Sequence, residues 1–282
     1  MSGVLARTVG VILVLQLALT GAAAQGINFA GGGSDVPTEV FADDGIEWDQ
    51  DRKVFTARGS ARAVRGEVQI FADTLRAFYL EKEGGGTDIR RLEAEGQVRI
   101  QSPGETAYGD FGVYEMGQAV LVLTSKPGKR VKLVTAEDEV TADRQLEYWE
   151  AKQLAVARGN AVAVREGKRL HADILTAHFG RDKNGKSRIH RVEAFDGVSI
   201  TTEDDVVSSD RAVYNVNSGI VTLSGSVKIT RGANQLNGCE AEVNLNTGKS
   251  QLKSCSSAIS GGNRVQGLLK AGKARKKIRK KE

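Results

Sequence analysis

Cysteine, histidine, proline and the aromatic residues are scarce in this sequence. Its 282 residues include 2 Cys, 3 His and 3 Pro, and aromatic residues make up 5%. Two cysteines exclude a disulfide-dense scaffold and a multi-cysteine zinc site. The histidines, His171, His178 and His190, have no cysteine or carboxylate partner at metal-ligand spacing, so we expect no metal site. With so few rings, the core should consist of Val, Ile, Leu and Ala.

A helical pattern is also absent. Beyond residue 24, no stretch sustains apolar residues at positions i, i+3, i+4 and i+7. Apolar and polar residues alternate instead, as in strands with one buried face. Pro37, Pro103 and Pro127 fall at predicted loops or strand edges. The sequence therefore predicts an all-β protein.

The one long apolar run lies near the N-terminus and is too short to span a bilayer. It covers residues 9–19, follows Arg7, and precedes an A-x-A cleavage site that ends at Ala24. We expect a signal peptide over residues 1–24, cleaved near Ala24, with an uncleaved anchor as the alternative. A flexible Gly-rich lead-in follows over 25–37. Export predicts a location outside the cytoplasm, where disulfides persist.

Positive charge is concentrated at the C-terminus. Eight Lys or Arg and no acid occupy residues 270–281, so the rest of the chain is close to neutral. Such a run is typical of a disordered, solvated tail, which we expect over 259–282. The functional alternative is attraction to anionic phosphates on a lipid or a membrane surface, with no nucleic-acid partner. The candidate contacts are Lys276, Lys277, Arg279, Lys280 and Lys281.

A repeat is what the sequence does contain. A small residue followed by Asp recurs along the chain, and a glycine interrupts the strand that precedes it, at a spacing typical of stacked repeats. We expect each Asp to lie at the start of a strand and to accept backbone N–H groups from the turn before it. The recurring aspartates are Asp73, Asp110, Asp143, Asp173 and Asp210, and the glycines are Gly59, Gly96, Gly159, Gly197 and Gly225.

A longer period of 100 residues is superimposed on the short one. Arg58, Ala72, Glu93, Val98 and Tyr114 are each followed, 100 positions later, by the same residue type. The body, residues 38–258, should therefore consist of two tandem modules, about 46–146 and 147–258, each built from three hairpins. Stacked antiparallel hairpins with apolar inner faces predict an elongated antiparallel β-jellyroll, a roll-like solenoid.

The repeated unit resembles the LptA/OstA family (organic solvent tolerance-like N-terminal domain). The resemblance covers residues 38–258, with two departures: the chain is longer than single-module carriers, and Cys239 stands where the repeat has Asp. It implies a periplasmic protein that transports lipopolysaccharide, shields its acyl chains and bridges inner- and outer-membrane transport complexes. The best-matching residues are Asp210, Tyr214, Gly219, Leu223, Gly225, Val227 and Ile229.

The resemblance also implies partners. Besides lipopolysaccharide, bound through its lipid A part, these are an LptC-like inner-membrane protein at the N-terminal edge and an LptD-like outer-membrane translocon at the other edge. Joining would be head to tail by β-augmentation, including self-association.

The apolar inner rows are the candidate lipid-binding residues. Burial is worth about 0.8 kcal/mol per CH₂, so exposing a dozen methylenes to water costs on the order of 10 kcal/mol. A lipid crossing an aqueous compartment therefore needs a continuous apolar groove. The alternative is that these rows only fill the core. The candidates are Val98, Ile100, Val198, Ile200, Leu223, Val227 and Ile229.

Motifs for other chemistry are weak. Residues 180–187, GRDKNGKS, satisfy a phosphate-binding pattern, but its mechanism needs a following helix, and residues 188–200 alternate as a strand. We therefore expect a hairpin loop there and no cofactor. No catalytic arrangement of Ser, His and Asp stands out, and we expect no enzyme. Two alternatives stay open: a non-lipid scaffold of the cell envelope, and a β-helix polysaccharide enzyme that pairs two acids.

Cys239 and Cys255 form a possible disulfide. If residues 245 and 249 pair around a three-residue loop, the cysteines lie directly opposite each other and can be joined. A one-residue slip places their side chains on opposite faces of the sheet and forbids the bond. The alternation of Val243 and Leu245 against Leu252 favours the slipped register. The pattern leaves both registers, and therefore the disulfide, open.

Overall fold

The computed structural model describes residues 37–82, 86–183, 187–247, 249–255 and 265–268. The predicted signal peptide, the lead-in up to residue 36 and the five basic tail candidates lie outside these residues. Disorder was expected from residue 259 onward, but Gln266–Leu268 form a strand because they pair with the edge of a preceding strand. No described segment is a helix that could cross a membrane.

The described residues form β-strands throughout, which confirms the all-β prediction. The strands are β1 (Glu39–Phe41), β2 (Gly45–Asp49), β3 (Val54–Arg65), β4 (Val68–Glu81), β5 (Thr87–Ser102), β6 (Glu105–Glu115), β7 (Val120–Thr124), β8 (Val131–Thr135), β9 (Asp138–Ala142), β10 (Gln145–Trp149), β11 (Leu154–Arg165), β12 (Lys168–Arg181), β13 (Ser187–Thr201), β14 (Asp205–Asn215), β15 (Ile220–Arg231), β16 (Asn234–Asn244), β17 (Lys249–Lys253) and β18 (Gln266–Leu268).

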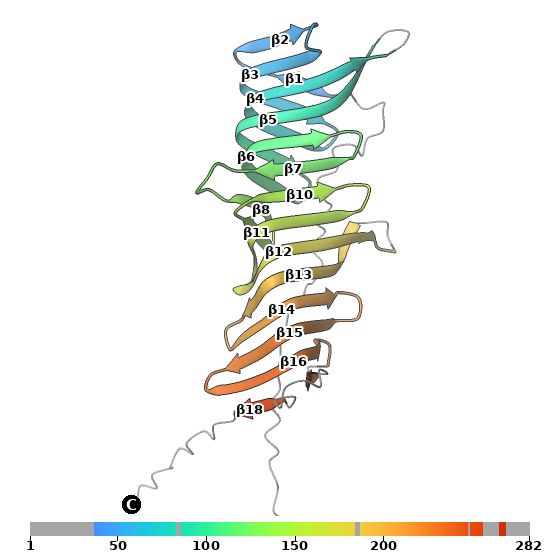
Figure 1. The fold of residues 1–282 in the computed structure, drawn as a ribbon. Coiled ribbons are helices and arrows are strands. Elements are labelled where there is room, and N and C mark those ends of the chain that lie inside the picture. Colours follow the sequence, from blue (N-terminus) through green and yellow to red (C-terminus); the bar gives the residue numbers. More distant parts are fainter. Residues whose placement is uncertain (1–36, 83–85, 184–186, 248, 256–264, 269–282) are drawn as a thin grey trace, which may run out of the picture.

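All strand pairs are antiparallel and join into one continuous ladder. β1 and β2 both pair with β3, and β3 to β6 follow in order. β6 pairs with both β7 and β8, which pair in turn with β10 and β9, and these two lead to β11. β11 to β16 again follow in order, and β17 and β18 both pair with β16. The strands stack as rungs along one long axis, and the result is an elongated roll (Figure 1).

Each long strand bends near its middle at a bulge. The register shifts, for example, between Glu95 and Val98 in β5 and between Ser224 and Val227 in β15. Gly96 there has φ 80° and Gly225 has φ 73°, a backbone conformation that glycine adopts without a steric penalty. The glycines therefore do not end the strands, as an interruption would. They fold each strand so that its two halves face each other across the core.

Four of the five recurring aspartates lie in mid-strand, which corrects the prediction that they start strands, and Asp143 lies in the bend between β9 and β10. Asp73 in β4 lies against Gly96 of the next strand, and Asp210 in β14 lies against Gly225. The glycine lacks a Cβ, and the space this leaves is filled by the carboxylate. Their partners also vary: Asp73 accepts a hydrogen bond from the Gln97 side chain at 3.2 Å, whereas Asp110 accepts one from a backbone N–H at 2.8 Å.

The 100-residue period is visible strand by strand. The bounds of β3, β4 and β6 recur 100 positions later in β11, β12 and β14. The first module departs from the second in its last two rungs, where β9 and β10 also stand in place of the unbroken β16. Its β7 and β8 pair with the two halves of β6, where the second module has the unbroken β15 on β14. Residues 125–130 are therefore a loop inserted at the bend of one rung.

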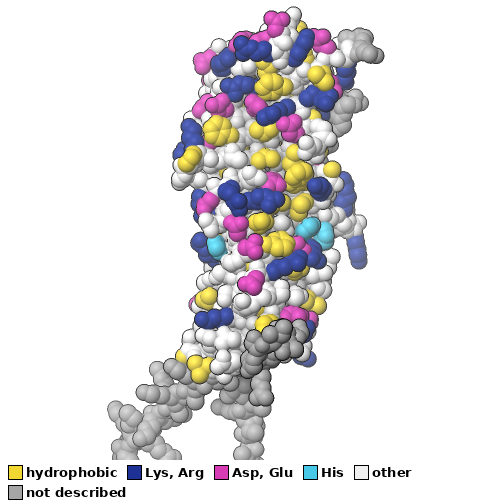
Figure 2. Space-filling view, in the orientation of Figure 1, with side chains coloured by type: hydrophobic (Ala, Val, Ile, Leu, Met, Phe, Trp, Pro, Cys, Tyr) yellow, Lys and Arg dark blue, Asp and Glu magenta, His cyan; other side chains and the backbone are white. Residues whose placement is uncertain are grey.

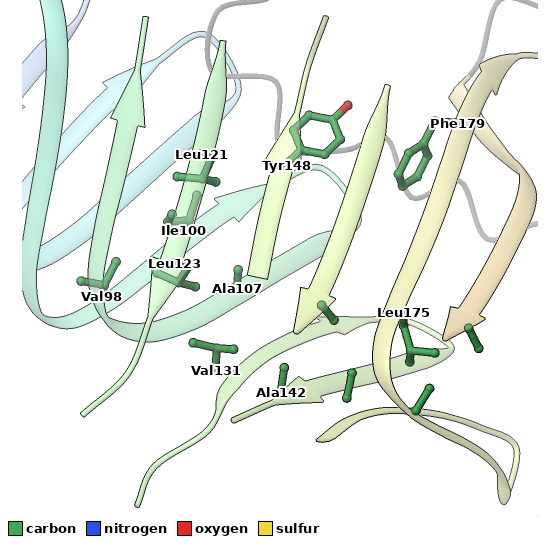
Figure 3. Packing of buried hydrophobic residues seen from close by; sticks show 14 of the residues in the cluster. Val98, Ile100, Ala107, Leu121, Leu123, Val131, Ala142, Tyr148, Leu175 and Phe179 are labelled. Carbon is green, nitrogen blue, oxygen red and sulfur yellow. The ribbon is translucent and has the colours of Figure 1, made fainter. Parts of the chain in front are cut away.

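The core lies between the two half-sheets. Figure 3 shows Val98, Ile100, Leu121, Leu123 and Val131 pointing into the space between opposing strands. Residues beside the bends are the most deeply buried, such as Ala61 and Ala172 at 0% exposure. The core is mostly aliphatic and also includes Tyr114, Tyr148 and Phe179.

Cys239 and Cys255 are disulfide-bonded in the structure, with their Cα atoms 5.0 Å apart. The ladder nevertheless has the slipped register, since Glu240 pairs with Lys253 and Ala241 with Leu252. The argument that this register forbids the bond is wrong. Cys255 lies beyond the last paired residue, and Cys239 lies in the bend of β16 where the pairing to β15 shifts. Neither cysteine is therefore bound to the alternation of a regular strand.

Candidate functional site

A pair of neighbouring cavities lies inside the roll, one near its N-terminal end and one at its centre. The N-terminal cavity, of about 320 Å³, is lined by strands β1 to β7. The central cavity, of about 240 Å³, is lined by strands β6 to β15. Most of the lining side chains in both are aliphatic or aromatic. Volumes near 300 Å³ are at the lower end of those of small-molecule sites.

The two cavities are built by equivalent residues of the repeat. Leu121 lines both, so they lie next to each other along the axis of the roll. A ligand that follows the axis would therefore pass from one set of apolar side chains to its copy. The equivalent pairs are Ala57 and Ala157, Ile70 and Leu170, Leu75 and Leu175, Ile89 and Ile189, Ile100 and Ile200, and Tyr114 and Tyr214.

The structure divides the predicted inner-row residues into two groups. All seven are buried, with exposures of 5% or less. Ile100 lines the N-terminal cavity and Ile200 the central cavity. The other five, Val98, Val198, Leu223, Val227 and Ile229, lie in the core and are not among the residues that line either cavity.

Sequence reasoning missed most of the cavity wall. It consists largely of half-buried side chains such as Leu92, Leu133, Val140 and Leu146, which pack against the core from the side away from the bends. The same period-two alternation continues into these half-strands. A search extended past each glycine would have found them.

Charged groups occupy one rim of the central cavity. Arg165 donates to Asp138 from Nε at 2.5 Å, and Lys168 and Arg169 lie on the following hairpin. Glu105, only 6% exposed, lies on the same rim and accepts a hydrogen bond from the Ser102 hydroxyl at 3.2 Å. An apolar interior bordered by both charges suits a ligand with a hydrocarbon part and a charged part.

Glu105 differs from its counterpart in the second module. Asp205 is held by Arg231, whose Nε lies 2.6 Å from a carboxylate oxygen, whereas Glu105 forms no ion pair with a described residue. Burial raises the pKa of the Glu105 carboxyl to about 7. Burial, together with the charges of Glu150 and Glu105, raises the pKa of Tyr148 in the same wall to about 12. The wall is therefore uncharged at this point in mildly acidic solution.

We expect Glu105→Gln to flatten the dependence of stability on pH. The folded-state pKa of about 7 lies above the ordinary 4.5, so Glu105 contributes stability that is complete below pH 4.5 and is lost as the pH rises through 7. That shift corresponds to about 3 kcal/mol. Chemical denaturation at several pH values between 4.5 and 8 measures it. If the free energies of unfolding of the wild type and the variant change with pH in parallel, the raised pKa of Glu105 is refuted.

The other predicted motifs have no site geometry. The GRDKNGKS stretch begins in β12 and reaches β13, so a strand and not a helix follows it, and its residues 184–186 lie outside the described residues. The rings of His178 and His190 lie 6.2 Å apart. Among the described residues no group of three or more His, Cys, Asp or Glu could hold a metal ion.

An elongated β-roll with apolar cavities along its axis has room for the hydrocarbon part of a ligand. The sequence profile of the LptA/(LptD N-terminal domain) LPS transport proteins matches residues 39–144 and again 139–249. The chain belongs to this family, which confirms the resemblance found in the sequence. It is a family of transport proteins and not of enzymes.

Two individual proteins are similar to this chain. An uncharacterized protein of Rhizobium meliloti (strain 1021) is 26% identical over 126 residues, which are 43% of this chain and 67% of the relative. The crystal structure of LptH from Pseudomonas aeruginosa, the LptA homologous periplasmic component of a lipopolysaccharide transport device, matches 84% of this chain and 96% of its own, with 11% identity and a TM-score of 0.21.

Proposed function

We propose that this protein binds lipopolysaccharide in the periplasm and shelters its acyl chains in the two cavities. The observation that carries the proposal is the pair of equivalent apolar cavities that meet at Leu121. Each methylene removed from water contributes about 0.8 kcal/mol, so a row of aliphatic side chains is a sufficient binding site. Ile100 and Ile200 are the predicted lipid contacts that line these cavities, and the other five predicted residues support the wall behind them.

The two ends of the stack of paired strands suggest how the protein is placed between membranes. At the N-terminal end, β1 and β2 expose Val40, Phe41, Ile46 and Trp48, with Trp48 55% exposed. An apolar edge strand invites pairing with another chain. This is the edge at which we place an LptC-like inner-membrane protein.

The C-terminal end is more polar. The short strands β17 and β18 cover β16, and Lys249 and Lys253 flank the outer strand, a feature that discourages unselective pairing. We place an LptD-like translocon there, and head-to-tail self-association would join this edge to the apolar one. The basic tail, Lys276 to Lys281, would contact the phosphates of lipid A or of a membrane surface.

Bound lipid is the decisive test. Native mass spectrometry of the purified protein should show co-purified lipopolysaccharide, and a photo-crosslinker at Ile100 or Ile200 should capture it in cells. The control is a crosslinker at Val206, which is 47% exposed on the outside. A protein that carries no lipid and stays silent at both interior positions would instead be a scaffold of the cell envelope.

A further inference from the structure

A row of alternating aromatic and cationic residues crosses the outer face of the first module. The strand register places Phe41 opposite Arg62, Arg62 opposite Phe71, Phe71 opposite Arg99, Arg99 opposite Tyr108, and Tyr108 opposite Lys132. The six residues come from six neighbouring strands, β1, β3, β4, β5, β6 and β8. We call this row the aromatic–cation ladder. At about 4.8 Å per strand it is about 24 Å long.

Each cation of the ladder lies over a ring. The guanidinium carbon of Arg62 is 4.4 Å from the centre of Phe41, and that of Arg99 is 4.0 Å from the centre of Phe71. The Lys132 ammonium is 5.4 Å from the centre of Tyr108. Such stacking orients a guanidinium but satisfies none of its N–H donors. The cations are therefore held in place with their hydrogen-bonding capacity unused.

The ladder cations also form few ion pairs with carboxylates. Among the described residues, no ion pair joins Arg62 or Arg99 to a carboxylate, and Lys132 reaches Glu139 only at 4.0 Å. Asp73 and Asp110, each two residues from a ladder ring on the same strand, are engaged by Gln97 and by Lys126 and Lys129.

The other half-sheet of the same module provides the contrast. There Arg58 pairs with Glu47, Arg76 with Glu95 and Arg91 with Glu93. On the face shown in Figure 2, basic and acidic side chains are interspersed along the whole length. A row of cations that stack on rings, in which neither Arg62 nor Arg99 has a carboxylate partner among the described residues, therefore differs from this paired half-sheet.

Folding does not require the ladder. The positions equivalent to Arg62, Phe71, Arg99 and Tyr108 in the second module are held by Val162, His171, Ser199 and Ser208, and the same strands form there. A requirement of the roll would be present in both copies. The difference points to a ligand that meets the first module only.

We propose that the ladder binds the charged saccharide portion of the lipopolysaccharide whose acyl chains lie in the cavities, an inference that rests on the proposed function. Like residues recur every second strand, about 9.6 Å apart, a spacing comparable to a disaccharide unit. A linear acidic glycan offers anionic groups at such intervals, and its sugar faces pack on rings.

A neutral row beside the ladder supports a sugar ligand. This row consists of Gln69, Gln101 and Thr106, each two residues from the ladder residue of its own strand and in register with one another. Their amides and hydroxyl can meet sugar hydroxyls. A membrane surface would favour a broad cationic patch, whereas this row is one residue wide. The inner faces of the same strands carry Ala63, Ile70 and Ile100 of the N-terminal cavity, so the ladder and this cavity lie on opposite faces of one half-sheet.

The test uses lipid-free saccharide released from lipopolysaccharide and titrated into the full-length mature protein by calorimetry. The wild type should bind it, with an affinity that falls as salt rises. The variant Arg62→Gln/Arg99→Gln/Lys132→Gln should lose at least tenfold, and Arg99→Gln alone a smaller part of that. The control Arg58→Gln/Arg90→Gln/Arg91→Gln removes the same charge from the other half-sheet, at residues that line neither cavity, and should bind like the wild type.

Two outcomes would overturn the proposal. One is a wild type that ignores the saccharide or a ladder variant that binds it like the control. The other is ladder-dependent binding of phosphatidylglycerol vesicles without saccharide binding, which would assign the ladder to a membrane. Native mass spectrometry of bound lipid A tests the proposed function of the cavities separately from the ladder proposal. The ladder variant should retain lipid A, and loss of lipid A from the wild type would instead remove the cavity assignment.

Discussion

Gly96→Ala should destabilise the protein by roughly 2 to 5 kcal/mol, although it adds one methyl group. Gly96 has φ 80°, where an L-residue with a Cβ costs about 1 to 2 kcal/mol. An added Cβ would also lie 2.8 Å from the Cβ of Asp73 and closer still to its carboxylate. Crowding of this kind costs about 1 to 3 kcal/mol in a packed site. The free energy of unfolding from guanidinium denaturation measures the sum.

Gly66→Ala separates backbone strain from crowding. Gly66 has φ 57°, but an added Cβ there would meet nothing within 4 Å. We expect only the backbone part, about 1 to 2 kcal/mol. The double variant Asp73→Ala/Gly96→Ala should recover part of the crowding cost, since it removes the carboxylate that fills the glycine's space but leaves the Cβ of residue 73 at 2.8 Å. Equal losses in Gly66→Ala and Gly96→Ala would show that the fit of Asp to Gly does not stabilise the bend.

Ala77→Phe and Ala177→Phe should weaken lipopolysaccharide binding while leaving the fold intact. Ala77 lines the N-terminal cavity and Ala177 is its equivalent in the central cavity, and both are only half-buried. A ring placed there takes the space of at least three methylenes of the ligand. At about 0.8 kcal/mol each, the loss is about 2.4 kcal/mol, or about fifty-fold in affinity. Titration with lipopolysaccharide measures it, and the combined variant should lose more than either alone.

Val206→Phe is the matched control for cavity filling. Val206 is 47% exposed, so the added ring lies outside the roll. This variant should bind lipopolysaccharide like the wild type. Because Ala77→Phe fills an existing space, its unfolding free energy should stay within about 1 kcal/mol of the wild type. Undiminished binding by a well-folded Ala77→Phe/Ala177→Phe variant would show that hydrocarbon does not occupy the cavities.

Local patterns in the sequence were enough to predict the all-β fold and to recognise the family. A period of two, glycines at constant spacing and the 100-residue repeat depend only on which residues follow one another. They predict hairpins and the order of rungs, because antiparallel neighbours along the chain pair with each other. The recurring glycines and aspartates were visible in the sequence. That they meet at the bend of a strand, and not at its start, was not.

The chain by itself determined which side chains face inward, since alternation assigns each residue to one face of a strand. Only the tertiary structure decided which of them meet a cavity: Val98 and Ile100 share a face two residues apart, yet Ile100 lines a cavity and Val98 is packed near the bend. Register was decided there too, and with it the Cys239–Cys255 bond and the ladder that brings Arg62 over Phe41. The physical reason is that the alternation of apolar residues shows only toward which face of the strand a side chain points. Cavities and cross-strand contacts depend on which residues of other strands lie opposite that side chain. That is determined by how the bent halves of distant strands diverge and align.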